Sequence, residues 1–154
     1  MSAAANIRLG WRMVWLTFVI SALAFGVLGS VGVFLKPLIA EFGWSRGEAS
    51  LGYTAAALSA AIFGIVWGFV ADRVGTRPLV IMGGTALGFS LIILSYQQSL
   101  WHFYLGYGLF GAFGLSSVTG PLYASVGHWF SRNAGVAMGV MASGAAVGQG
   151  VVPF

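Results

Sequence analysis

The chain has 154 residues, of which 58% are hydrophobic and 6% are charged, and its mean hydropathy is +0.91. Soluble domains carry about 25% charged residues, so this composition excludes a water-facing surface and predicts the lipid bilayer as the solvent. The formal net charge of +4 comes from basic residues scattered singly between apolar blocks, which argues against nucleic acid as a partner.

Five apolar segments are long enough to cross a bilayer as helices, because a hydrocarbon core of about 30 Å needs roughly 20 residues. No Asp, Glu, Lys or Arg lies inside them, and their continuous character favours helices over the alternating strands of a barrel. The first is too long for the apolar region of a signal peptide, about 7–15 residues, and is interpreted as retained. The sequence therefore predicts an all-α integral membrane protein with helices at about 13–35, 49–71, 78–96, 103–126 and 134–154.

The breaks between these segments carry recognisable local signals. Ser45 and Glu48 have the spacing of a capping box at the start of the second helix. Gly75 lies where a left-handed cap would end that helix, and Pro78 fits the first turn of the third. Pro121 lies late in the fourth helix and is expected to kink it unless neighbouring groups satisfy the freed carbonyl.

The basic residues predict the orientation. With the N-terminus inside, cytoplasmic segments hold five basic residues and external loops hold two, in agreement with the positive-inside rule. We therefore expect a multi-pass protein of the plasma (inner) membrane with a cytoplasmic N-terminus. The inner residues are Arg8, Arg12, Arg73, Arg77 and Arg132, and the outer residues are Lys36 and Arg46.

Small residues at spacings of four predict close packing between the first and fifth helices. The face expected on the first helix is Ala22, Gly26 and Ser30; on the fifth it is Gly135, Gly139 and Ser143, with Gly144 and Gly148 as a second face. Generic membrane packing explains the same pattern.

The loop between the second and third helices holds the most informative motif, Gly-x-x-x-Asp-Arg-x-Gly-x-Arg. Its residues are Gly68, Asp72, Arg73, Gly75 and Arg77, called the loop motif below. A carboxylate at the C-terminal end of a helix is unfavourable unless a positive partner compensates the helix dipole. Arg73, Arg77 or the N-terminus of another helix could be this positive partner of Asp72. The alternative is an ordinary turn whose charges only set the topology.

The loop motif resembles the loop 2–3 signature of the major facilitator superfamily. The resemblance implies that this chain is the first five helices of a six-helix half and that its partner half is missing. It also implies that Asp72 contacts a helix end of that half and that Arg73 completes a charge relay, which stabilises the outward-open state. The chain ends just after Pro153 without a polar tail, and we expect it to be a fragment that is inactive alone.

Two further stretches narrow the resemblance to the monocarboxylate transporters and their oxalate/formate antiporter-like relatives. They are residues 31–46 and the passage from 127–132 into 135–139, where Arg132 is the only basic residue although that passage usually carries two or three. The branch implies secondary active transport of a small organic anion, a mono- or dicarboxylate, by alternating access. Proton coupling stays open, because the Asp/Arg pair of the eighth helix is not within this chain.

Lys36 is the expected substrate residue. A lysine at the edge of a membrane helix is often an anchor whose ammonium lies among the lipid headgroups. At the mouth of a cavity the same ammonium attracts anions, and the resemblance implies that a matching lysine captures the substrate. Ser116, Ser117 and Thr119 on the fourth helix are further candidates, although membrane hydroxyls more often bond the carbonyls of their own helix.

Catalysis and cofactors find no support in the sequence. Cysteine is absent, and His102 and His128 have no neighbour at metal-ligand spacing. No nucleophile–base pair is present, so we expect neither an enzyme nor a metal site. The alternatives left open are a carrier of the same superfamily for another metabolite or drug, and a membrane scaffold or remnant that moves nothing.

Overall fold

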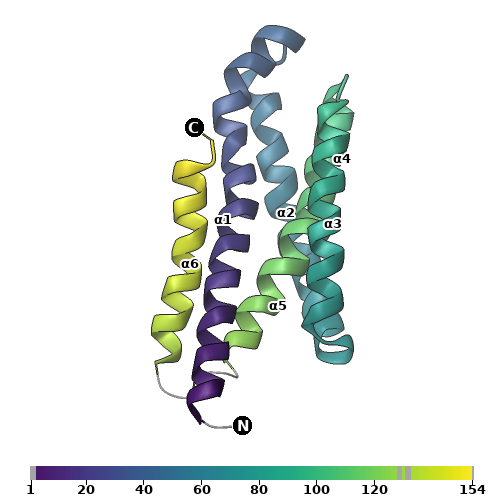
Figure 1. The fold of residues 1–154 in the computed structure, drawn as a ribbon. Helices are drawn as coiled ribbons and strands as arrows, with labels where there is room; N and C mark the ends of the chain where they lie inside the picture. Colours follow the sequence, from purple (N-terminus) through teal and green to yellow (C-terminus); the bar gives the residue numbers. More distant parts are fainter. Residues whose placement is uncertain (1–2, 128–129, 131–132, 154) are drawn as a thin grey trace.

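A computed structural model describes residues 3–127, 130 and 133–153, and all regular elements within them are helices. Figure 1 shows the helices running up and down side by side, with the N-terminus and the α2–α3 connection at one end and the α1–α2 connection at the other. The elements are α1 (Ala3–Phe42), α2 (Arg46–Val74), α3 (Thr76–Ser95), α4 (Leu100–Leu109), the π-helical segment η1 (Phe110–Leu115), α5 (Ser116–Gly127) and α6 (Ala134–Val151).

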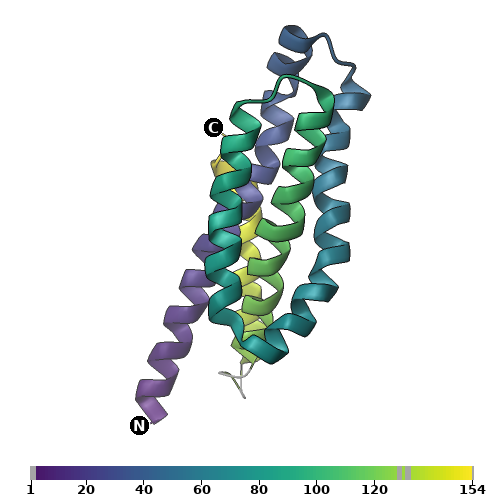
Figure 2. The same ribbon diagram turned by 90° about the vertical axis from the view of Figure 1, so that its right-hand side faces the viewer.

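Four helices in the described part of the chain are long and apolar enough to cross a membrane, namely α1, α2, α3 and α6. The predicted fourth crossing is divided by η1 into pieces of 10, 6 and 12 residues. These pieces follow one another without a gap and form one rod between α2 and α3 (Figure 2). The all-α membrane fold predicted from composition is confirmed, with the fourth crossing built from three pieces.

The structure refines the predicted helix limits. α1 extends beyond 13–35 at both ends and continues through Pro37, where the missing N–H removes one backbone bond near an exposed helix end. The capping box is present: the Ser45 N–H donates to Glu48 Oε2 at 2.8 Å, and the Glu48 N–H donates to Ser45 Oγ at 3.2 Å. Gly75 is the single residue between α2 and α3, and its φ of +82° explains why glycine stands there.

The packing of α1 against α6 depends on small residues, although not on the first series expected for the last helix. A Cβ at Gly148 would run into the carbonyl oxygen of Ala22, and one at Gly144 into the backbone of Phe18. A Cβ at Gly135 or Gly139, by contrast, would meet nothing within 4 Å. The second face therefore makes the contact with α1, and the series expected first points away from it.

The rod formed by α4, η1 and α5 packs between α2 and α3 through further glycines. Gly111 approaches the carbonyl of Ala56 on α2, while Gly83 of α3 lies under Ser117 and Val118. The Ser116 N–H bonds Gly111 O five residues back, which is the π-helical pattern. This rearrangement leaves room beside the Gly111 backbone for α2.

The π-helical segment also receives a bond from α2. Trp67 Nε1 donates to Ala112 O at 2.6 Å, and Ser116 Oγ donates to the same oxygen at 2.7 Å. In lipid every backbone acceptor needs a protein partner, because no water is available. The indole therefore joins α2 to the irregular part of the rod and helps to fix its position.

Candidate functional site

The loop motif lies at the end of α2 that is predicted to be cytoplasmic, beside a hollow of about 450 Å³. Gly68, Asp72 and Gly75 line it from the α2 side, and Gly120 and Pro121 line it from α5. This hollow presents backbone and small side chains around a single carboxylate. Its shape and charge suit a segment with positive electrostatic potential, such as a helix N-terminus.

Asp72 has no ion pair within the part of the chain that the structure describes. Arg73 and Arg77, the neighbouring partners considered from sequence, are both exposed. Arg77 lines a different hollow, of about 270 Å³, together with Met13 and Leu16 of α1. Four of the five motif residues thus line two different hollows, and the carboxylate of Asp72 lies at the negative end of the α2 dipole.

Lys36 lies on the outer part of α1, is exposed and makes no ion pair with any described residue. A hollow of about 310 Å³, the outer hollow, opens between α1, α2 and α6 on its inner side. Gly32, which lines this hollow, precedes Lys36 by one helical turn, so both face the same direction on α1. A mobile ammonium at the mouth of such a hollow attracts anions.

The three hydroxyls expected to touch substrate are instead occupied by their own helix. Ser116 Oγ donates to Ala112 O and Thr119 Oγ1 to Leu115 O, each at 2.7 Å, and Ser117 Oγ donates to Phe113 O. Ser116 and Ser117 are buried, and Ser117 packs against Gly83 of α3. These bonds are the ones that membrane hydroxyls commonly make to their own helix, and a contact of the three side chains with substrate stays a prediction.

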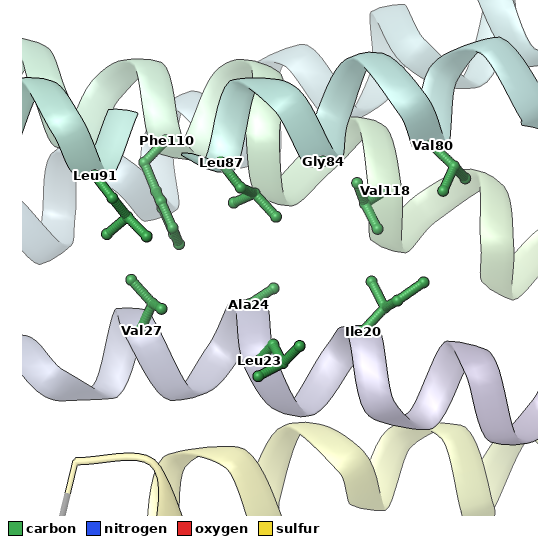
Figure 3. A pocket seen from close by; sticks show the side chains of 10 residues that line it. All are labelled: Ile20, Leu23, Ala24, Val27, Val80, Gly84, Leu87, Leu91, Phe110 and Val118. Atoms are coloured by element: carbon green, nitrogen blue, oxygen red, sulfur yellow. The ribbon is translucent and has the colours of Figure 1, made fainter. Parts of the chain in front are cut away.

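A fourth hollow, of about 390 Å³, runs between α1 and α3. Figure 3 shows its walls: Ile20, Leu23, Ala24 and Val27 project from α1 toward Val80, Leu87 and Leu91 of α3, with Phe110 and Val118 beside them. All side chains that line it are apolar. An anion placed there would lose its hydration without gaining a donor, so this apolar hollow does not suit a carboxylate substrate.

Metal-ligating side chains do not gather in threes anywhere in the described ranges. His102 Nδ1 lies 2.8 Å from Ser99 Oγ at the start of α4, where the hydroxyl also caps the helix. His128 and Arg132 lie outside the described residues.

Two polar residues of the outer hollow were missed by reasoning from sequence. Tyr53 of α2 and Gln149 of α6 both line it. A signal existed for Gln149, because an uncharged amide within a membrane helix is itself unusual enough to suggest a role. Tyr53 resembles the aromatic residues of membrane interfaces, and nothing in the sequence indicates that it faces α6.

Comparison with known families decides what this bundle is. The sequence profile described as Major Facilitator Superfamily matches residues 14–154. The chain belongs to the major facilitator superfamily. Membership of a superfamily of transporters agrees with the prediction that the chain is not an enzyme.

Curated relatives of this superfamily member include several monocarboxylate transporters. Monocarboxylate transporter 13 of Rattus norvegicus is 32% identical over 139 residues, which cover 90% of this chain and 32% of the relative. The Bos taurus protein of the same name is 34% identical over 88% of this chain and 32% of its own length. The Fujikurins efflux protein of Gibberella fujikuroi is 35% identical over 60% of this chain and 20% of its own length. The chain thus spans about a third of the length of the transporters that it matches.

Proposed function

We propose that this chain supplies five membrane crossings of a secondary active transporter that carries a small organic anion, a mono- or dicarboxylate, by alternating access. The main support is that monocarboxylate transporters match about nine tenths of the chain. Because the chain spans about a third of those proteins, we expect it to act only together with a second half and to be inactive alone.

The two ends of the bundle have different roles in this proposal. At the outer end, the unpaired Lys36 raises the local concentration of anions at the outer hollow. At the inner end, Asp72 binds the positive N-terminus of a helix in the second half. This contact closes the cytoplasmic side when the transporter opens outward. Coupling to a proton is not part of the proposal, since the residues of this chain give no argument for it.

We further propose that the N-terminus is cytoplasmic. Support comes from the distribution of charge: Arg8, Arg12, Arg73 and Arg77 gather at the end of the bundle with the N-terminus, and Lys36 and Arg46 at the opposite end (Figure 1).

Cysteine labelling tests this orientation, because the chain has no cysteine of its own. In intact cells, a membrane-impermeant maleimide is expected to label Gln98→Cys, in the α3–α4 connection, and to label Val74→Cys only after permeabilisation. Both side chains are exposed, so accessibility within the protein is matched. Labelling of Val74→Cys alone in intact cells would reverse the proposed orientation.

Lys36→Ala, introduced into the protein expressed from its full coding sequence, is expected to raise the KM for carboxylate uptake about tenfold. Hydrogen bonds to charged groups contribute about 1.5–3 kcal/mol, and the lower value corresponds to about a tenfold loss of affinity for the anion. Uptake of radiolabelled lactate and oxalate into proteoliposomes measures the effect. Arg46→Ala removes an equally exposed outer cation at the start of α2 and serves as the matched control. An unchanged KM in Lys36→Ala would show that Lys36 is only an interfacial anchor.

A second candidate function is export of another metabolite, which the similarity to the Fujikurins efflux protein favours. An exporter of a larger, weakly charged molecule would show no saturable carboxylate uptake and no dependence on Lys36. A non-transporting scaffold would show no saturable flux of either kind. The same proteoliposome assay therefore separates the three functions.

A further inference from the structure

The outer hollow is lined by polar side chains from two different helices. Tyr53 enters it from α2 and Gln149 from α6, while the α1 side contributes Gly29 and Gly32. A Cβ at Gly29 would lie 3.2 Å from Gln149 Cγ, so glycine at this position lets the amide side chain lie across α1. Its volume of about 310 Å³ is close to the lower limit of ligand pockets, about 300 Å³.

The hydrogen-bonding groups of this hollow are available to a ligand. Neither the Tyr53 hydroxyl nor the Gln149 amide forms a hydrogen bond with a described residue. Ser50 differs, because its hydroxyl already donates to Gly47 O at 2.8 Å. Most other lining residues are apolar. Tyr53 is 45% exposed and Gln149 is also exposed, so a ligand reaches both groups without displacing a protein partner. The phenol and the amide supply the donors that a carboxylate requires.

We infer that Tyr53 and Gln149 are specificity-determining residues that hydrogen-bond the carboxylate of the transported anion in the outer hollow, on the N-terminal side of Lys36 along α1. This inference rests on the proposed transport function and adds two residues that the sequence did not suggest. Lys36 supplies the charge at the mouth, and the phenol and amide hold the carboxylate by neutral donors in the hollow. The lining contains no cation, so the site selects a small anion with one charge over a dianion.

The test measures the concentration dependence of lactate and oxalate uptake by the full-length transporter in proteoliposomes. Tyr53→Phe and Gln149→Leu are each expected to raise the KM for lactate about tenfold, the lower end of the effect of losing a hydrogen bond to a charged group because both side chains are partly solvated, while Vmax stays within about twofold. Lactate is expected to be the better substrate. Tyr96→Phe and Gln98→Leu remove the same groups from exposed positions at the α3–α4 connection and are the matched controls.

The possible results separate this inference from the proposed function. An unchanged KM in both variants, together with impaired uptake by Lys36→Ala, would overturn the subsite and leave the transport function standing. A fall in Vmax at constant KM would also overturn it, because the residues would then support a conformational step. Absence of saturable uptake of either anion by the unmodified protein would overturn the transport function itself.

Folding of the variants is checked by their elution as single species in detergent. If Gln149→Leu is recovered poorly, Gln149→Glu keeps the size of the side chain and places a carboxylate in the hollow. It is expected to raise the KM at least as far as Gln149→Leu, because the new carboxylate repels the carboxylate of the substrate. An unchanged KM in Gln149→Glu would overturn the role of this position.

Discussion

Gly148→Ile is expected to prevent stable packing of α6 against α1. The substituted side chain would meet the Ala22 carbonyl and the Ala22 Cα, which belong to the α1 backbone and cannot move aside as a flexible side chain can. Overpacking in a well-packed interior costs about 1–3 kcal/mol, and more where backbone must be displaced. This contact joins the last crossing to the first, so we expect a cost of at least about 3 kcal/mol and little recovery of monodisperse protein.

The thermal midpoint of a fluorescent fusion in detergent measures this effect. A loss of about 3 kcal/mol corresponds to a decrease of roughly 6–12 °C in a domain of this size. Gly148→Ala is expected to lie between the wild-type protein and Gly148→Ile, because even one methyl group meets the carbonyl. Gly139→Ile is the matched control on the same helix, since a Cβ there meets nothing within 4 Å. Equal midpoints for Gly139→Ile and Gly148→Ile would contradict the packing described for α6.

This contrast between two glycine faces shows where the sequence stops being informative. Hydropathy determines how many segments cross the bilayer, and local chemistry places their ends, as Ser45 with Glu48 and Gly75 demonstrate. Both kinds of signal depend on residues close together in the chain. Whether Gly139 or Gly148 meets α1 depends on the rotation of α6 about its axis, and two glycine series of equal spacing leave that rotation undetermined.

The candidate site shows the same limit: local signals in the sequence do not reveal which side chains of distant helices line one hollow. Lys36 and the loop motif were found because charges are rare in this chain. The outer hollow was not predicted, because Tyr53 and Gln149 are 96 positions apart and line one hollow only after α1, α2 and α6 are assembled. The π-helical turn at Phe110–Leu115 is likewise a response to packing against Ala56 and Trp67 rather than a local preference.

Asp72→Asn is expected to have opposite consequences in the chain alone and in the full-length transporter. In the 154-residue chain the carboxylate has no ion pair with a described residue and lies at the negative end of the α2 dipole. Removing its charge there should be neutral or slightly stabilising. In the transporter the same charge is proposed to hold a positive helix terminus of the second half, and its loss should reduce uptake about tenfold.

The expected size follows from the energetics of charges at helix ends. Such interactions contribute up to about 2 kcal/mol when partly buried, and about 1.4 kcal/mol corresponds to a factor of ten in rate. Initial rates of lactate uptake, normalised to reconstituted protein, measure the effect, and the thermal midpoint of the 154-residue chain gives the comparison. Glu41→Gln is the matched control, because Glu41 is an exposed carboxylate at the outer end of α1. If Asp72→Asn destabilised the isolated chain as strongly as it reduced transport, the carboxylate would have a partner within this half. The proposed contact between Asp72 and the second half would then be wrong.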